Sequence, residues 1–524
     1  MATTNVVNLD ALIPRADLAA PGELSEYIPA LAITGLEPRG LLYPALRKPD
    51  FQRETANWTP EQVADLVITF VNRELIPAVI LWRAGHDVFV IDGAHRLSAL
   101  IAWVHNDYGD RERSRRYFHN AISEEQTKAA EKARSLVHTT IGSYEDHRTA
   151  NESPTNKPAE MVERANRIGW INIPTQWIRN SDHEKAEKAF FRINQGGTKL
   201  DATERRLLIS RDSPTALSAR AILRAGTGHN YWNKFAPGVR EKIEELGGEI
   251  FKLLYDPVLS LPIKTLDLPV AGQGYGPRAL PFVFDLVNVV NKVSTKDSSS
   301  KDVSGRLPPD ADGSKTVSYL IEVRRSLWRI CSNHPSSLGL HPALYFYARG
   351  GSFQSAALLS YVVLMTDWNT EEFKTFTRIR SRFEEFLLRY RGITEAVRRL
   401  GSGARSRPRI TALYRKIISG LDGGSTSEEI ADVLRADPIF DFFVAAVSVD
   451  DLLDHEEGTF SRDVKGATFL REALPTAPKC PTCGGILHHN GMQVGHKKPR
   501  REGGSGNLNN GMIQHPFCNS TFDN

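Results

Sequence analysis

The stretch TPEQVADLVITFVNRELIPAVILWRAGHDVFVIDGAHRLSALIAWV, residues 59–104, decides the fold of the N-terminal region. Thr59 opens a helix-start signal, and the apolar spacing that follows it predicts an amphipathic helix. AVILW and DVFVI are short β-branched runs on either side of a glycine turn, so they predict two strands. A second helical pattern begins near His95, directly after Asp92 and Gly93. The stretch therefore predicts a strand–turn–helix junction at this pair.

The pattern on the C-terminal side of this stretch extends the same α/β region to about residue 210. Residues 106–160 are polar and charged, and they predict a helical insertion. Residues 170–178, WINIPTQWI, predict a further strand. Residues 183–210 predict a helix, a Gly-Gly loop and another helix.

Beyond residue 210 the sequence is mostly helical in pattern. Residues 292–315 are rich in Ser, Asp, Lys and Gly and predict a mobile loop. Residues 401–409, GSGARSRPR, predict a short basic loop, either solvated or in contact with phosphate. A chain of 524 residues is too long for one core, so we expect a multi-domain α+β protein with domains at 1–210, 211–475 and 476–524.

Composition sets wide limits on function. Hydrophobic residues make up 41% and charged residues 24%, as in globular proteins, and the net charge of +4 is too small for DNA binding by charge alone. The first 20 residues lack a basic segment followed by an apolar core, and no long apolar run occurs. We therefore expect a soluble, cytoplasmic protein with no membrane partner.

The cysteines point to metal binding. Cys331 stands alone, whereas the other three cysteines crowd into the last segment of the chain. There, a C-x-x-C pair is followed at a distance by an H-x-x-C pair. Four such ligands suit a tetrahedral, structural zinc ion. The predicted zinc ligands are Cys480, Cys483, His515 and Cys518.

The segment between these pairs resembles the HNH nucleases of the ββα-metal type. The resemblance is carried by QVGHKKP, by Gly503–Gly504, by Asn510 and by a final Cys-Asn pair. The spacing from Asn510 to the second ligand pair favours it over Asn507 and Asn509 as the central asparagine. The resemblance implies a DNA endonuclease with the catalytic residues His496, Asn510 and Asn519.

The family pattern implies a role for each of these residues. His496 is the general base, because an imidazole can take a proton from water near neutral pH. Asn510 fixes the geometry of the loop or the base, and Asn519 helps to hold a catalytic Mg²⁺ or Mn²⁺. Gly495 departs from the pattern, because many members carry an acidic metal ligand there. Without that acidic residue, the catalytic metal would be bound by Gln493, by a backbone oxygen or by the DNA itself.

Basic residues flank the proposed base. They form either a solvated loop or a surface that binds DNA phosphates without reading sequence, and beside an HNH base we favour DNA contact. His488 and His489 match no family position, and we expect them to be surface residues or spare ligands. The predicted DNA-binding residues are Lys497, Lys498, Arg500 and Arg501.

Three separated pieces form a second constellation: KPDFQRETANW (48–58), VIDGAHRLSAL (90–100) and FFRINQGGTKLDATE (190–204). A glycine at a strand–helix junction lets backbone amides approach a phosphate, and a nearby arginine adds positive charge. Together the pieces resemble the ParB/sulfiredoxin-like domain of modification-dependent (type IV) restriction enzymes and phage-defence nucleases, such as the GmrSD and SspE groups, over about residues 40–210.

In that family the D-G-x-x-R junction binds and hydrolyses a nucleoside triphosphate, which implies GTP or ATP as a ligand. His95 stands where many restriction members carry Gln, so the resemblance implies nucleotide binding more strongly than hydrolysis. Asn194 and Gln195 are alternatively turn formers that bond their own backbone. The implied nucleotide-binding residues are Gln52, Arg53, Asp92, Gly93, His95, Arg96, Arg192, Asn194, Gly196 and Gly197.

Two hypotheses follow. The first is an anti-phage restriction endonuclease, a nickase or double-strand nuclease, in which the N-terminal module senses a nucleotide or modified DNA and controls the HNH module. The second is a non-catalytic, ParB-like DNA-binding regulator with a zinc-binding tail. The sequence of the helical middle region reveals no chemistry that would separate them.

Overall fold

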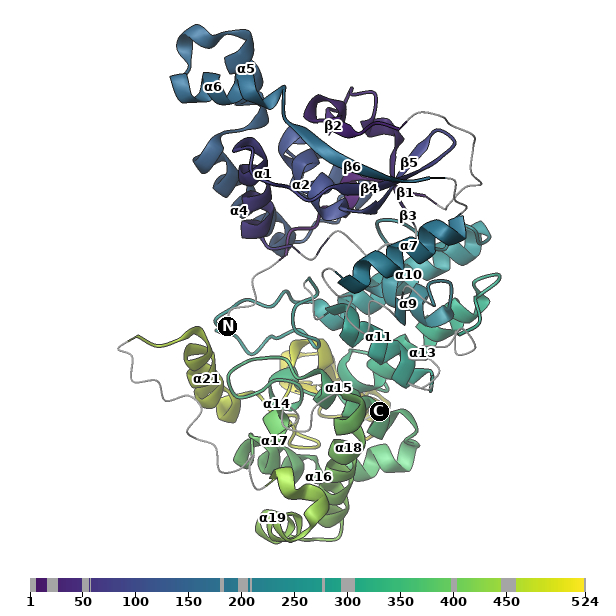
Figure 1. Cartoon of the computed structure of the whole chain (residues 1–524). Coiled ribbons are helices and arrows are strands. Elements are labelled where there is room, and N and C mark those ends of the chain that lie inside the picture. The colour runs from purple at the N-terminus through teal and green to yellow at the C-terminus, as the bar shows by residue number, and fades with distance from the viewer. Residues whose placement is uncertain are drawn as a thin grey trace. The chain divides into compact units, whose positions relative to one another are not determined.

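The structure is a computed structural model that describes residues 6–16, 27–49, 56, 58–179, 183–196, 206–207, 210–275, 279–293, 307–396, 403–443 and 459–522. It is a mixed α+β structure that is mostly helical (Figure 1). The chain divides into two compact units. The first comprises Met1–Asp212, Thr227–Lys234 and Tyr275–Pro281, and the second comprises Ser213–Gly226, Phe235–Gly274 and Phe282–Asn524.

The first unit is built on a mixed six-stranded sheet in the order β1-β3-β5-β4-β6-β2. β1, β3 and β5 run parallel to one another, whereas β4 and β6 run in the opposite direction. The carboxyl ends of β1, β3 and β5 therefore share one edge of the sheet. The strands are β1 (Arg15–Ala16), β2 (Ala30–Ala32), β3 (Leu46–Pro49), β4 (Val79–Ala84), β5 (Asp87–Asp92) and β6 (Asn172–Ile178).

Side chains that alternate along β4 and β5 point to opposite faces of the sheet, and each face packs into a different hydrophobic core. Val79, Leu81, Val88 and Val90 join a core with α1 (Pro60–Val71), α2 (Ala94–His105) and α4 (Glu124–Ile141). Trp82, Ala84, Phe89 and Ile91 pack instead against Ala186 and Phe190 of α7 (His183–Gly196). The strands predicted from these β-branched runs are confirmed, and their side chains alternate between the two faces with a period of two.

The predicted helices that begin at Thr59, near His95 and at residue 183 are confirmed, whereas the helix expected after the Gly-Gly loop lies almost entirely outside the described residues. Thr59 caps α1 through a reciprocal pair of bonds with Gln62, which fixes the start of the helix. The expected helical insertion consists of α3 (Glu112–Tyr117), α4, α5 (Tyr144–Glu152) and α6 (Ala159–Ile168).

The sequence missed β1, β2 and β3, which are short and lack an alternating apolar pattern. β3 depends on distant partners, because the buried Lys48 ammonium donates to Asp10 Oδ1 at 2.6 Å and to Asp10 O at 2.8 Å. Arg15 Nη2 donates to Asp10 Oδ1 at 2.9 Å. A buried cation of this kind is stable only with its partner in place, and the local sequence does not show the partner.

The second unit is mainly helical. Its helices are α9 (Pro214–Leu223), α10 (Pro237–Tyr255), α11 (Ala279–Val290, which begins in the first unit), α13 (Ser314–Cys331), α14 (Pro342–Tyr345), α15 (Ser355–Thr366), α16 (Thr370–Arg389), α17 (Ile393–Ala396), α18 (Gly403–Asp422), α19 (Ser427–Ala436), α21 (Arg462–Ala473) and α22 (Pro516–Thr521). α9, α10 and α13 pack together, and α18 packs on both α15 and α16. α10 approaches α9 closely at Gly247, where an added Cβ would lie 2.6 Å from Ala221 O.

Two loop predictions have different outcomes. The basic loop expected at 401–409 is wrong from residue 403 onward, because α18 begins at Gly403 and contains Pro408. Pro408 is the sixth residue of α18, where it removes one i→i−4 hydrogen bond, and the Gly, Ser and Pro content misled the prediction. Residues 294–306, the greater part of the mobile loop predicted at 292–315, lie outside the described residues.

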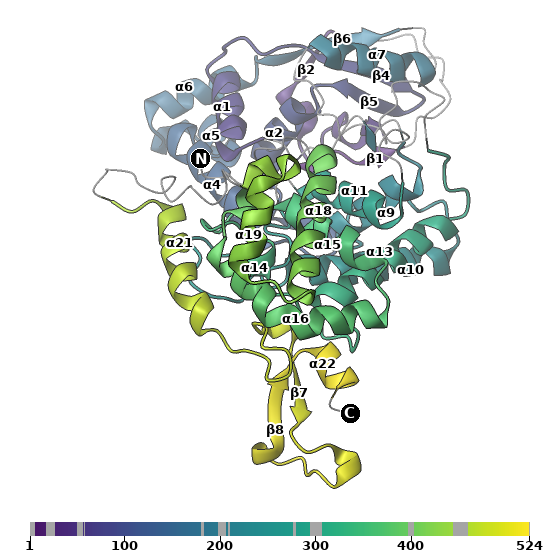
Figure 2. The ribbon, with the colours of Figure 1, turned by 90° about the horizontal axis from the view of Figure 1, so that it is seen from below.

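The C-terminal residues belong to the second unit. β7 (Gln493–His496) and β8 (Gly511–Gln514) form an antiparallel pair, and α22 follows directly. Figure 2 shows this strand pair extending from the helices of the unit. No helix in the described ranges is long and apolar enough to span a membrane.

A buried ion pair joins the helices to the C-terminal segment. Arg380 Nε donates to Glu384 Oε1 at 2.7 Å, and both side chains are almost fully buried. Glu384 Oε1 also accepts from the Tyr345 hydroxyl at 2.9 Å, and Oε2 accepts from the Ile486 amide at 2.6 Å. Arg380 Nη2 donates to Gly339 O at 3.2 Å. Every member of this network has a partner, as a buried ion pair requires.

We expect Glu384→Ala to lower the free energy of unfolding by about 3–5 kcal/mol, because it leaves the Arg380 charge buried without a partner. The measurement is the midpoint and slope of chemical denaturation. Glu428→Ala is the matched control: it breaks the exposed Arg389–Glu428 pair and should change stability by less than about 1 kcal/mol. Equal destabilisation by the two variants would contradict this view of the network.

Candidate functional site

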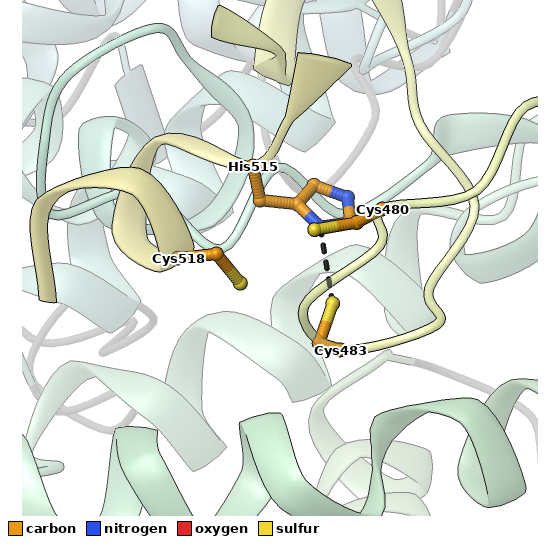
Figure 3. A group of neighbouring side chains, drawn as sticks. All are labelled: Cys480, Cys483, His515 and Cys518. Atoms are coloured by element: carbon orange, nitrogen blue, oxygen red, sulfur yellow. Dashed lines mark hydrogen bonds between the residues drawn. The ribbon is translucent and has the colours of Figure 1, made fainter. Parts of the chain in front are cut away.

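The four predicted zinc ligands lie together and are all buried. Their candidate ligand atoms lie within 4.8 Å of one another, and Figure 3 shows the four side chains gathered around one point. Cys480 and Cys483 come from the turn before β7, His515 follows β8, and Cys518 lies in α22. Three thiols and one imidazole in this arrangement could hold zinc.

The orientation of His515 supports a metal centre. Its Nε2 lies 3.2 Å from Ile486 O, and its Nδ1 lies 3.3 Å from Cys483 Sγ. A backbone carbonyl that fixes one ring nitrogen leaves the other to face the metal. Burial lowers the pKa of His515, so the ring is held neutral, as a metal ligand must be.

Hydrogen bonds among the three thiols do not stabilise all of them as thiolates. Hydrogen bonds from Cys483 and Cys518 lower the pKa of Cys480. The same sharing with Cys480 raises the pKa of Cys483 to about 11 and also raises that of Cys518. Only one of the three sulfurs is therefore stabilised as a thiolate by its neighbours. A bound cation would stabilise all three.

The cysteine turn packs directly on α16. Gly484 has a φ of +69°, and an added Cβ there would lie 2.9 Å from Ser381 Cβ. An added Cβ at Gly485 would lie 2.3 Å from Arg380 Nε. Both positions need glycine because of this close approach. The sequence showed the glycine pair but not the helix that requires it.

His496 ends β7 opposite Gly511 of β8. It is partly exposed, and within the described part of the chain its imidazole has no hydrogen bond or ion pair. An added Cβ on the preceding Gly495 would point at Gln514 and Asn519. Because side chains alternate along a strand, His496 faces the opposite side of the strand pair. The imidazole is thus free to bind an incoming group.

Asn510 clamps the loop that connects β7 to β8. Its Oδ1 accepts from the Lys498 amide at 2.8 Å, and its Nδ2 donates to Lys498 O at 3.1 Å and to Ser505 O at 2.7 Å. An added Cβ at Gly504 would lie 1.8 Å from Lys498 O, so the loop closes only over glycine. These contacts fix the loop beside His496.

The predicted DNA-binding residues are exposed on this loop. Lys497 Nζ donates to Asn509 O at 3.0 Å, so its side chain lies along the loop. Arg500 and Arg501 lie in a 3₁₀ turn, Arg500–Glu502, and Arg501 Nε is 4.0 Å from Glu502 Oε1. The loop therefore presents positive charge next to the His496 imidazole.

A chain of amides occupies the space beside Gly495. Gln514 Nε2 donates to Asn519 Oδ1 at 3.0 Å, and Asn519 Nδ2 donates to Gln493 Oε1 at 3.0 Å. Gln493 Nε2 in turn donates to Asn333 O at 2.6 Å. An added Cβ at Gly495 would lie 2.1 Å from Gln514 Nε2, so the fully buried Gln514 excludes a larger residue there. Sequence reasoning missed Gln514, because its role appears only in this packing.

The N-terminal candidate residues lie at the carboxyl edge of the sheet. β5 ends at Asp92, and Gly93 has a φ of +93° before α2 begins. Arg96 Nη2 donates to Asp92 Oδ2 at 2.5 Å, and Nη1 donates to Pro77 O at 2.8 Å. The His95 ring lies 5.5 Å from the Trp58 ring, centroid to centroid. A phosphate at this junction would compete with Asp92 for Arg96.

The other two motif pieces are only partly described. Gln52, Arg53 and Gly197 lie outside the described residues. The exposed Arg192 and the backbone of Asn194 and Gly196 belong to the last turns of α7. α7 packs through Phe190 in the same core as Ile91, the residue before Asp92.

Comparison with known proteins bears on the first unit. Residues 39–209 match the family model of the GmrSD restriction endonuclease N-terminal domain. No curated protein and no solved structure matches the chain. The family match covers the Asp92–Arg96 junction and α7, and it supports a GmrSD-like type IV restriction protein, hence a nuclease that acts on DNA.

We expect Cys480→Ser and Cys518→Ser to lose a bound zinc ion of about one per chain, because each removes one of four ligands. His496→Ala should retain the zinc, since its side chain lies outside the cluster. The measurement is metal content by mass spectrometry after gel filtration. Cys331→Ser, which replaces a buried cysteine elsewhere, is the matched control. Full zinc in Cys480→Ser would contradict the site.

Proposed function

We propose that this chain is a restriction DNA endonuclease whose catalytic module is an HNH domain at residues 476–524. The observation that carries the proposal is the free His496 imidazole on a strand pair, beside a basic loop held by Asn510. The order strand, loop, strand, helix is that of a ββα-metal module. The match of residues 39–209 to a restriction endonuclease domain supports the same class of function.

In this proposal His496 acts as the general base. The imidazole takes a proton from water as the water oxygen bonds to the phosphorus of a DNA phosphodiester; the bond from phosphorus to one sugar oxygen breaks, and that leaving oxygen takes a proton from solvent. Asn510 positions the loop, so that the exposed Lys497, Lys498, Arg500 and Arg501 contact phosphates on either side. These contacts carry no sequence information and weaken as salt rises.

A catalytic Mg²⁺ or Mn²⁺ would be held by neutral oxygens. Asn519 Oδ1 and Gln493 Oε1 each accept one amide hydrogen bond in the chain beside Gly495, on the side of the strand pair opposite His496. A cation that acts on the same phosphate as His496 would therefore also need a backbone oxygen or the DNA as a ligand. When bound, such a cation offsets negative charge on the phosphate. Because no carboxylate replaces the family's acidic ligand at Gly495, the phosphate itself supplies the negative charge. Cation binding would therefore depend on DNA binding.

The N-terminal module, residues 1–210, would bind a nucleoside triphosphate, ATP or GTP, at the Asp92–Arg96 junction and regulate cutting through the helical region, residues 211–475. The ParB/sulfiredoxin-like resemblance motivates this role, and a left-handed glycine before a helix start suits phosphate binding. Arg96 would exchange Asp92 for a phosphate oxygen. Asp92, once released, could hold the cation that accompanies the nucleotide.

A second candidate is a non-catalytic, ParB-like DNA-binding regulator with a zinc-binding tail. The packing at Gly495 favours it, because Gln514 fills the space of an acidic ligand. The two candidates differ in one measurable property, DNA cleavage that depends on His496.

We expect His496→Ala to lower DNA cleavage by at least about 100-fold, because it removes the general base. The assay follows plasmid and modified phage DNA with Mg²⁺ or Mn²⁺, each with and without ATP or GTP. His86→Ala, which removes an exposed histidine from the β4–β5 turn, is the matched control. Equal cutting by wild type and His496→Ala would refute His496 as the general base, and no cutting by wild type under any condition would favour the regulator.

We expect Arg96→Ala to weaken binding of ATP or GTP by about tenfold or more, because a charge-assisted bond to phosphate is lost. Isothermal titration calorimetry measures the affinity. Arg148→Ala, which breaks an exposed ion pair in α5, is the control for lost surface charge. Arg96→Lys should recover part of the affinity, and unchanged affinity in Arg96→Ala would refute the assignment.

A further inference from the structure

A second group of metal-ligating side chains lies outside the cysteine cluster. One ring nitrogen each of His488 and His489 and one carboxylate oxygen of Asp267 lie within 4.8 Å of one another. His489 Nδ1 is 3.0 Å from Asp267 Oδ1, and the two imidazole rings are 4.4 Å apart, centroid to centroid. We propose that these three residues bind a second divalent transition-metal ion of the zinc class: Zn²⁺, Co²⁺ or Ni²⁺.

The burial of His488 is the second observation that supports this site. The residue is only 4% exposed, so the expectation that it lies at the surface is wrong. Its Nδ1 accepts a long bond from the Asn490 amide at 3.4 Å, and its Nε2 has no hydrogen bond of good geometry among the described residues, although the ring interacts with the backbone of Leu268. A metal on Nε2 needs the ring proton on Nδ1 and would therefore replace the Asn490 bond. A buried ring nitrogen without a partner is costly, and metal binding is one way to satisfy such a ring.

One other imidazole lies beside the group. The His341 ring is 5.1 Å from the His488 ring, centroid to centroid, and meets it edge-on.

The donor set points to an exchangeable ion rather than a second structural zinc. Two imidazoles and one carboxylate leave a coordination position for water, as in zinc sites that keep an open position. The exposed side of the group agrees with this, because the Asp267 side chain is 58% exposed and that of His489 is 34% exposed. Imidazole and carboxylate select Zn²⁺, Co²⁺ or Ni²⁺ over Mg²⁺.

The position of the group suggests what the ion would do. Asp267 belongs to the segment after α10, and the histidines come just before β7. The same two segments are already joined by a bond from Asn490 Nδ2 to Asp256 O, at 2.9 Å. An ion at Asp267, His488 and His489 would fasten the base of the β7–β8 strand pair to the helical part of the same unit.

The test is the number of cobalt ions bound by the full-length, tag-free protein, followed by mass spectrometry and absorption. Wild type should bind about two Co²⁺ per chain, of which about one shows the sulfur-to-cobalt charge-transfer band of the cysteine site. Asp267→Asn and His489→Ala should each bind about one, with that band unchanged. The retained band shows that the neighbouring fold is intact.

His86→Ala and Cys480→Ser are the controls for this experiment. His86→Ala should leave both ions bound, and Cys480→Ser should lose the charge-transfer band while a weaker cobalt spectrum from nitrogen and oxygen ligands remains. Wild-type binding of a single ion, or equal binding by wild type and Asp267→Asn, would overturn the proposal and leave a simple His489–Asp267 ion pair. Neither outcome depends on whether the protein cuts DNA.

Discussion

The buried Arg380–Glu384 pair is the interaction on which the C-terminal segment depends. A carboxylate and a guanidinium that are both removed from water are stable only if nearly all of their hydrogen-bonding groups are used. Glu384 uses its remaining oxygen for the amide of Ile486, and the carbonyl of Ile486 in turn orients His515. One charge in α16 is therefore connected, through a single residue, to a member of the Cys/His cluster that could bind a metal. The cluster is thus held by contacts with α16 as well as by its own turn.

The same integration explains the unusual chemistry beside His496. The amide chain from Gln514 through Asn519 and Gln493 ends on the backbone of Asn333, in the segment after α13. A carboxylate at Gly495 would break this chain, because its Cβ alone would overlap Gln514. Gly495 is therefore required by its surroundings, and the neutral amides around it tie the strand pair to the helical part of the unit.

Sequence patterns predicted the parts of the structure that depend on local physics. The β-branched runs of β4 and β5, the helix start at Thr59 and the x-x spacing within each ligand pair are local signals, and all have the predicted structure. The features that were missed depend on partners far along the chain. Lys48 of β3 is bonded to Asp10, and the glycine turn after Cys483 is explained only by α16.

In both candidate sites the polar groups are bonded to other residues of the site, and a ligand would replace these bonds. A phosphate would replace Asp92 at Arg96, and a cation would replace the amide donors at the Asn519 and Gln493 oxygens. Arg96 is bound by Asp92, and the oxygens of Asn519 and Gln493 are bound by neighbouring amides. Under the proposed function, each site would gain its full charge only when its ligand arrives, a nucleotide in the first unit and DNA in the second. His496 differs, because within the described residues its imidazole has no partner to release. The base would then be ready at all times, and control of cutting would lie in the assembly of cation and DNA around it. A nuclease that shares its cell with its own genome needs control at that step.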